Sequence, residues 1–110
     1  MTYRPFELSG KVALITGGNS GIGLGMAQAL AEAGADIAIW GSSAAKNAAA
    51  LESLRPFGVR LHALACDISD EAAVERAFAA TVAQLGCVDA CFANAGTYGH
   101  ASRFTALETA

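Results

Sequence analysis

The chain has 110 residues with a formal net charge of −3, and 54% of its residues are hydrophobic. This length supports one small domain, and the acidic balance argues against a nucleic-acid-binding surface. No apolar run reaches the ~18 residues that a membrane span needs, and the N-terminus lacks the apolar core of a signal peptide, so we expect a cytoplasmic protein without a membrane or nucleic-acid partner.

Strand and helix signals alternate along the first half of the chain. Residues 11–16 form a short apolar run that predicts a buried strand. A helix should begin near Ser20, because apolar residues recur after it at helical spacing. These residues are Ile22, Met26, Leu30 and Ala33. A second strand is predicted over 36–40, and the helix after it should run to about Arg55, because Pro56 ends it.

The alternation continues in the second half. In residues 59–65 apolar positions alternate with polar ones, which suits a strand near a sheet edge. Ser69 is expected to cap the next helix. The apolar stripe of that helix consists of Val74, Phe78, Val82 and Leu85. A fourth strand is predicted over 88–93, and its largely apolar sequence is typical of a strand that is covered on both faces and paired on both sides.

This order of elements predicts an α/β fold with a Rossmann-type, doubly wound parallel sheet. Right-handed crossovers give the spatial strand order 3-2-1-4. In that order the fourth strand is an outer strand, although its apolar sequence suits an inner one. We therefore expect residues 1–110 to be the N-terminal portion of a dinucleotide-binding domain, with an incomplete sheet that needs a further part or a partner.

A glycine-rich segment lies between the first strand and the first helix. It runs Thr-Gly-Gly-Asn-Ser-Gly-Ile-Gly over residues 16–23. Glycines here let backbone N–H groups approach a phosphate closely, and the helix that follows presents the positive end of its dipole to that anion. The segment therefore predicts dinucleotide binding. The alternative is a plain connecting turn, because the glycine spacing departs from the GxGxxG fingerprint.

Three motifs of the chain resemble those of the short-chain dehydrogenases/reductases. Residues 16–23 match the TGxxxGxG motif of that family, and residues 93–96, Ala-Asn-Ala-Gly, match its NNAG motif with alanine in the first place. Asp67 corresponds to the aspartate that follows the third strand. The resemblance covers essentially the whole chain. It implies an oxidoreductase that transfers a hydride between NAD or NADP and a small-molecule alcohol or carbonyl substrate.

The resemblance also implies roles for particular residues. Those that would surround the cofactor phosphates and ribose lie in the glycine-rich segment: Gly17, Asn19, Ser20, Gly21 and Ile22. Gly23 would let the first helix pack closely on the sheet. Asp67 would accept a hydrogen bond from the adenine amino group beside Ile68; the structural alternative is a loop or helix-capping carboxylate. The residues that would line the cofactor at the mouth of the fourth strand are Asn94, which would also tie strands together, Ala95 and Gly96.

The end of the second strand sets the choice between NAD and NADP, because an acid there binds the ribose 2′-hydroxyl and an arginine holds a 2′-phosphate. Asp36 lies at the start of that strand, the wrong end for the cofactor. The expected position falls at Gly41, followed by Ser42 and Ser43, with neither acid nor arginine. The serine hydroxyls and Lys46 could accommodate a phosphate, which favours NADP slightly.

Trp40 and the three cysteines, Cys66, Cys87 and Cys91, are interpreted as core residues. The chain has neither a CxxC spacing nor clustered histidines, so no metal is expected.

The catalytic residues of the family find no match in the chain. Its chemistry uses a tyrosine as acid/base and a lysine four positions later. Here Tyr3 is followed at that spacing by Glu7, and Tyr98 by Ser102. We therefore expect the 110-residue chain to be inactive by itself. Two hypotheses remain: the cofactor-binding half of an oxidoreductase, which in this family is usually a dimer or tetramer, or a stand-alone, non-catalytic dinucleotide-binding module.

Overall fold

The computed structural model describes residues 7–94, in which strands and helices alternate. The strands are β1 (Val12–Thr16), β2 (Asp36–Gly41), β3 (Leu61–Ala65) and β4 (Ala90–Ala93). The helices are α1 (Gly21–Glu32), α2 (Ala44–Leu54) and α3 (Glu71–Leu85), with a 3-10 turn over Arg55–Phe57. Neighbouring strands are parallel and their order is β3-β2-β1-β4. The predicted doubly wound topology with strand order 3-2-1-4 is therefore confirmed.

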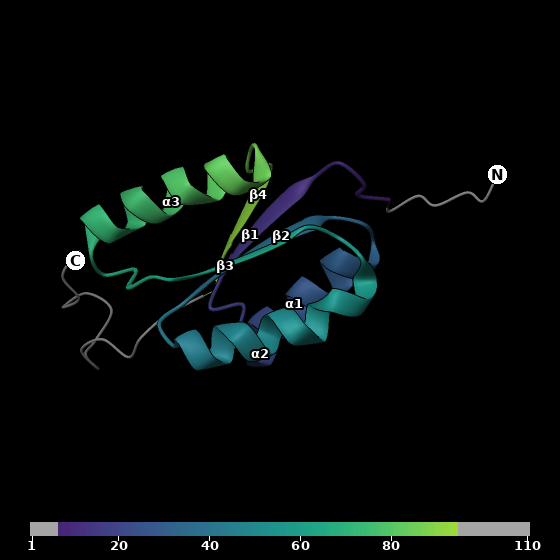
Figure 1. Cartoon of the computed structure of the whole chain (residues 1–110), viewed down its shortest axis with the longest axis horizontal. Helices are drawn as coiled ribbons and strands as arrows, with labels where there is room; N and C mark the ends of the chain where they lie inside the picture. The colour runs from purple at the N-terminus through teal and green to yellow at the C-terminus, as the bar shows by residue number, and fades with distance from the viewer. Residues whose placement is uncertain (1–6, 95–110) are drawn as a thin grey trace, which may run out of the picture.

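Helices cover both faces of the sheet: α1 and α2 lie on one face and α3 on the other (Figure 1). Side chains alternate between the two faces along each strand. In β1, Ala13 and Ile15 therefore pack with α1 and α2, and Val12 and Leu14 pack with α3. Each face of the sheet has its own apolar core, as a parallel sheet requires.

The helix faces that pack on the sheet differ from the predicted stripes. The buried residues of α1 are Gly23, Ala27 and Ala31, and those of α3 are Ala77, Thr81 and Leu85. Ile22 and Phe78, both expected in the core, are 79% and 47% exposed. The buried residues of α1 each follow a predicted position by one residue; in α3, Ala77 and Thr81 each precede a predicted position, while the predicted Leu85 is buried. Small side chains let a helix lie close to its neighbour.

The cap of α3 also differs from the prediction. Asp70, rather than Ser69, precedes the helix, and its carboxylate accepts a hydrogen bond from the Ala73 N–H at 3.2 Å. Ser69 is engaged elsewhere, because its N–H and hydroxyl both donate to the Asp67 carboxylate. An aspartate at this place satisfies a free N–H group and puts negative charge at the positive end of the helix.

β4 is an outer strand of the described sheet, where it pairs with β1 alone. Its residues are exposed except for the half-buried Phe92. β4 is therefore the outer strand that the order 3-2-1-4 predicts, and within residues 7–94 no element lies beyond it to cover its apolar residues. Cys87 and Cys91 are exposed, contrary to their interpretation as core residues, whereas Cys66 is buried.

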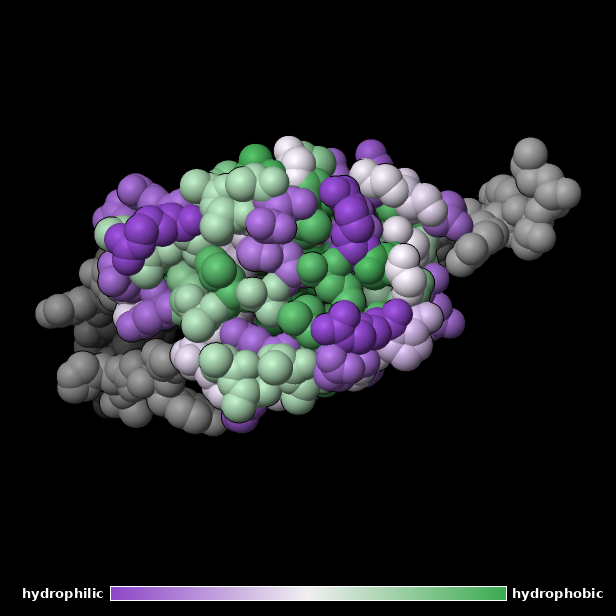
Figure 2. All heavy atoms as spheres, in the orientation of Figure 1, coloured by the Kyte–Doolittle hydropathy of each residue, from purple (hydrophilic) through white to green (hydrophobic). Residues whose placement is uncertain are grey.

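Apolar surface is also visible between the two helical layers. On the face shown in Figure 2, hydrophobic residues form a band at the level of the sheet, with hydrophilic residues around it.

The helices are short. None of those in residues 7–94 is long and apolar enough to cross a membrane.

Candidate functional site

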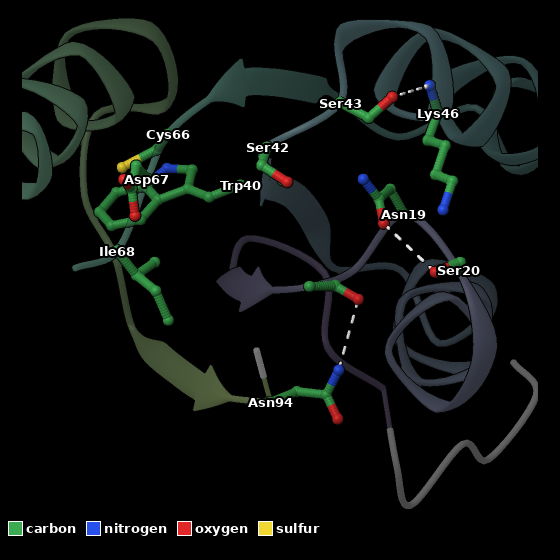
Figure 3. A pocket seen from close by; sticks show the side chains of 12 residues that line it. Asn19, Ser20, Trp40, Ser42, Ser43, Lys46, Cys66, Asp67, Ile68 and Asn94 are labelled. Carbon is green, nitrogen blue, oxygen red and sulfur yellow. Dashed lines mark hydrogen bonds between the residues drawn. The ribbon is translucent and has the colours of Figure 1, made fainter. Parts of the chain in front are cut away.

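A cleft of about 370 Å³ opens at the carboxyl ends of the strands, which is where doubly wound sheets bind ligands. Residues at or after the carboxyl end of each of the four strands line it (Figure 3). The lining residues are Gly17, Asn19 and Ser20 after β1; Trp40, Gly41, Ser42, Ser43 and Lys46 at and after the end of β2; Cys66, Asp67 and Ile68 after β3; and Asn94 after β4. The parallel topology thus gathers segments that are far apart in the sequence.

The turn after β1 leads directly into α1. Gly17 has a φ of 68°, in the left-handed region that favours glycine, and its N–H donates to the Trp40 carbonyl at 2.8 Å. The Ser20 side chain makes no cap hydrogen bond to α1; its hydroxyl donates to Asn19 Oδ1 at 3.4 Å. No side chain of the turn therefore takes up the first N–H groups of α1, which suits them to an anion.

Gly23 and Asn94 join the first helix, the turn and the end of β4. A Cβ at Gly23 would lie 2.6 Å from Asn94 Nδ2 and closer still to the Gly17 carbonyl oxygen. Asn94 Nδ2 donates to that carbonyl at 3.3 Å, and the Asn94 N–H donates to Thr16 Oγ1 at 3.1 Å. Asn94 thus links β4 to the turn after β1, as the resemblance implies, and the close packing of α1 requires a glycine at position 23.

A buried amide that sequence analysis missed lies behind the cleft. Asn47 of α2 donates through Nδ2 to the Gly41 carbonyl at 3.0 Å, and its Oδ1 accepts from Asn19 Nδ2 at 2.9 Å. Asparagine is a weaker helix former than the alanines around it. Its presence in such a helix is the sequence signal that could have pointed to a specific role.

The residues after β2 combine hydroxyl groups with one cation. Ser43 caps α2, because its Oγ accepts from the Lys46 N–H at 3.2 Å, while Ser42 is exposed. The Lys46 side chain extends toward Asn19 and Ser20 (Figure 3). It forms no ion pair within residues 7–94. This end of β2 can therefore offer a positive charge to a ligand.

Asp67 and Ile68 line the cleft on the side of β3. The Asp67 carboxylate accepts from the Ser69 hydroxyl at 2.6 Å and from the Ser69 N–H at 3.0 Å. These two hydrogen bonds, that of the hydroxyl above all, hold the pKa of Asp67 below its usual value. Asp67 is thus an ionised acceptor with a fixed orientation beside the 41% exposed Ile68.

Two buried residues, Trp40 and Cys66, lie at the base of the cleft. The Trp40 indole N–H donates to Thr81 Oγ1 of α3 at 3.0 Å, so Trp40 is a core residue, as predicted, and also lines the cleft. The Cys66 N–H donates to the Gly41 carbonyl at 3.3 Å. Burial, and then the charge of Asp67, raise the pKa of the Cys66 thiol, which keeps it protonated at neutral pH.

Most of the predicted cofactor-binding residues line the cleft. Gly21, Ile22 and Gly23 belong to the first turn of α1 and are not among the lining residues. Ala95 and Gly96 lie outside the described residues. Within residues 7–94 no three His, Cys, Asp or Glu side chains gather in a way that could hold a metal ion.

Asp36 lies at the opposite end of β2 from the cleft. Its Oδ2 forms an ion pair with Arg60 Nη2 at 2.9 Å, and its Oδ1 accepts from the Arg60 N–H at 2.8 Å. Asp36 is therefore a structural ion-pair partner, in agreement with its rejection as a cofactor residue. β3 begins at Leu61, after this pair, rather than at residue 59.

Comparison with known proteins gives a family match along nearly the whole chain. Residues 11–110 match the sequence model of the family described as short chain dehydrogenase. The "Probable NADP-dependent mannitol dehydrogenase" of Yarrowia lipolytica is 42% identical over 91 residues, which cover 83% of this chain and 33% of that protein. The chain spans about a third of the length of the curated relatives it matches.

Solved structures with the same arrangement include enzymes with either cofactor. NAD+-bound xylitol dehydrogenase is 36% identical with a TM-score of 0.81, over 83% of this chain and 35% of that one. L-sorbose reductase from Gluconobacter frateurii, complexed with NADPH and L-sorbose, is 33% identical with a TM-score of 0.82, over 96% of this chain and 40% of that one.

Proposed function

The chain belongs to the short-chain dehydrogenase family, and on that premise we propose that it is the dinucleotide-binding part of an NAD(P)-dependent oxidoreductase. The observation that supports this most is the convergence of the turn after β1, the end of β2 and the segment after β3 on one cleft. The proposed substrates are small alcohols or carbonyl compounds, the class named in the relatives' mannitol, xylitol and sorbose. We further propose a dimer or tetramer, which the resemblance implies, and a cytoplasmic location, which the N-terminal sequence favours.

The residues present fit such a cofactor. Because Gly23 lets α1 lie close to the Gly17 carbonyl, the N-terminus of that helix stays near the ends of the strands. The pyrophosphate would lie against this N-terminus and the turn before it. The adenine would lie beside Ile68, with its amino group toward the Asp67 carboxylate. When bound, the nicotinamide accepts or supplies a hydride, and the residues of this chain bind and orient it.

We favour NADP over NAD for this site. The residues lining the end of β2 include Lys46 and two serines but no carboxylate. A 2′-phosphate would gain a charge-assisted hydrogen bond from Lys46. A 2′-hydroxyl would find no carboxylate there to accept its hydrogen bond. The mannitol dehydrogenase and sorbose reductase relatives named with NADP or NADPH are consistent with this choice.

Binding without turnover is the proposed behaviour of the 110-residue chain. Neither tyrosine is followed by a lysine four positions later, and proton transfer needs a group positioned at the reacting atom. This same observation is what favours the second candidate, a stand-alone binding module. A cofactor-dependent dehydrogenase activity of the pure chain would contradict the assignment of the catalytic residues to another part of the protein.

Two glycines of α1 provide a matched test of dinucleotide binding. Gly23→Ala puts a methyl group against the Gly17 carbonyl, whereas Gly25→Ala puts one into open space. We expect Gly23→Ala to weaken NADP+ binding by about tenfold or more, since a backbone shift of about 1 Å disrupts the phosphate site. Gly25→Ala should leave the dissociation constant unchanged and stabilise the chain by about 1 kcal/mol.

The measurement is a titration of the full chain with NADP+ and NAD+, followed by calorimetry and by the fluorescence of Trp40, its one tryptophan. Circular dichroism shows whether each variant is folded. Saturable binding that Gly23→Ala weakens and Gly25→Ala preserves would support the proposal. Failure of both dinucleotides to bind the folded chain would overturn it.

A further inference from the structure

We propose that Asn47 is a positioning residue of the dinucleotide site and acts on the nucleotide through Asn19. The inference rests on the proposed function, because it assigns a role within a site that binds a dinucleotide. Asn47 is not itself a lining residue of the cleft. It lies behind the lining residues, on the buried face of α2, and is 4% exposed.

Asn47 connects two lining segments that come from different strands. Its Oδ1 accepts from Asn19 Nδ2 at 2.9 Å, and its Nδ2 donates to the Gly41 carbonyl at 3.0 Å. Both ends of this buried amide are therefore paired, as burial of a polar side chain requires. One side chain of α2 thus holds the turn after β1 to the end of β2.

The pairing sets the orientation of Asn19, which does line the cleft. Its amide nitrogen donates to Asn47. Its amide oxygen accepts from the Ser20 hydroxyl at 3.4 Å, as Figure 3 shows. Without Asn47, the Asn19 side chain would be free to take other rotamers. A contact group ordered before the ligand arrives lowers the entropy cost of binding.

Gly41 makes this pairing possible. A Cβ on Gly41 would lie 2.5 Å from Asn47 Oδ1 and closer still to Asn19 Nδ2. The hydrogen bond between the two asparagines therefore occupies the space that a side chain at position 41 would need. In other doubly wound folds an acid near this place recognises the ribose. Here the asparagine pair takes up that space instead. A side chain at position 41 would therefore disrupt the pair, and the pair requires glycine there.

The test combines Asn47→Ala and Asn19→Ala, singly and together, with a control on the same helix face. Ala50 is 2% exposed on α2 and does not line the cleft, so Ala50→Gly weakens the helix without touching Asn19. Calorimetry gives the dissociation constant of NADP+ for each folded full chain. NMR of the cofactor-free chain records the side-chain amide resonances of Asn19.

We expect Asn47→Ala to weaken NADP+ binding by up to about tenfold, because the Asn19 side chain would then have to be ordered when the nucleotide binds. Ala50→Gly should lower the denaturation midpoint and leave the dissociation constant unchanged. The double variant should bind no more weakly than Asn19→Ala, because Asn47 acts through that residue. The Asn19 amide resonances should move in Asn47→Ala and stay in place in Ala50→Gly.

Two outcomes would overturn the inference while leaving the proposed function intact: an equal effect of Asn47→Ala and Ala50→Gly on binding, or independent effects of the two asparagines. The inference would also be overturned if the Asn19 amide resonances did not move in Asn47→Ala. If the unsubstituted folded chain bound neither dinucleotide, the proposed function itself would fail, and the role of Asn47 toward a nucleotide would fail with it.

Discussion

β1 and β4 are neighbours in one parallel ladder and both are apolar in sequence, yet they differ in burial at nearly every position. Every residue of β1 is buried, whereas β4 is exposed apart from Phe92. β1 has a strand on each side and helices over both faces, while β4 has β1 as its single strand neighbour within residues 7–94. An apolar sequence thus suits a strand for burial, and its neighbours decide whether burial occurs.

Substitution at paired positions of β1 and β4 should give the largest difference in stability between the two strands. Leu14 of β1 is opposite Cys91 of β4, and Leu14 is 2% exposed while Cys91 is exposed. We expect Leu14→Ala to lower the free energy of unfolding by about 2–5 kcal/mol through loss of burial and an unfilled cavity. Cys91→Ala should change it by less than about 0.5 kcal/mol. Urea denaturation followed by circular dichroism measures both.

Similar losses at the two positions would mean that β4 is covered in solution. Sedimentation analysis of the same samples would then show whether a second copy of the chain covers it, since an uncovered apolar strand is prone to pair with another chain.

The link between α3 and the covered part of the sheet allows a second, smaller test. Thr81→Val removes the acceptor of the buried Trp40 indole N–H, which should cost about 1–3 kcal/mol because that donor stays buried without a partner. Thr81→Ser is the control, because it keeps a hydroxyl at the same place. If thermal unfolding showed the valine variant to be as stable as the serine variant, the hydrogen bond would not anchor α3.

The outer strand β3 provides the smallest expected effect, which depends on pH. His62 Nε2 is buried and has no hydrogen-bond partner among residues 7–94, and burial lowers the pKa of His62 below its usual value of 6.5. The unfolded chain therefore takes up the proton more readily. Stability should be complete above about pH 6.5 and should fall as the pH drops from there through the lower pKa of the folded state.

His62→Leu should reduce this loss, because it removes the titrating group from β3. Urea midpoints at about pH 7.5 and about pH 5.5 compare the two proteins within the range where histidine titrates and carboxylates remain ionised. An equal change in midpoint for both proteins would show that His62 does not contribute.

The strand order could be predicted because each strand, helix and turn has a signal in its own segment of the sequence. Apolar runs, helical spacing and glycine turns alternate from residue 11 to residue 93, and parallel crossovers then leave few topologies. The buried helix faces could not be predicted in this way. A stripe of large apolar residues selects Ile22 and Phe78, but α1 and α3 turn smaller side chains toward the sheet.

In the candidate site too, some residues could be predicted from the sequence and others could not. The glycine-rich turn, Asp67 and Asn94 are recognisable from motifs and their spacing, and the structure brings them to one cleft. Asn47 has no motif, because its role depends on two segments that meet it only after folding. The same holds for Trp40, which the sequence places in the core and the structure places at the base of the cleft as well.

The small-residue face of α1 also fixes a distance. Gly23, Ala27 and Ala31 are the buried residues along this helix, and they set how thick the layer between its axis and the sheet can be. The height of the helix N-terminus above the strand ends follows from that thickness. α1 therefore acts as a spacer of fixed thickness, and a larger side chain on the first turns of its buried face would move the helix N-terminus away from the strand ends.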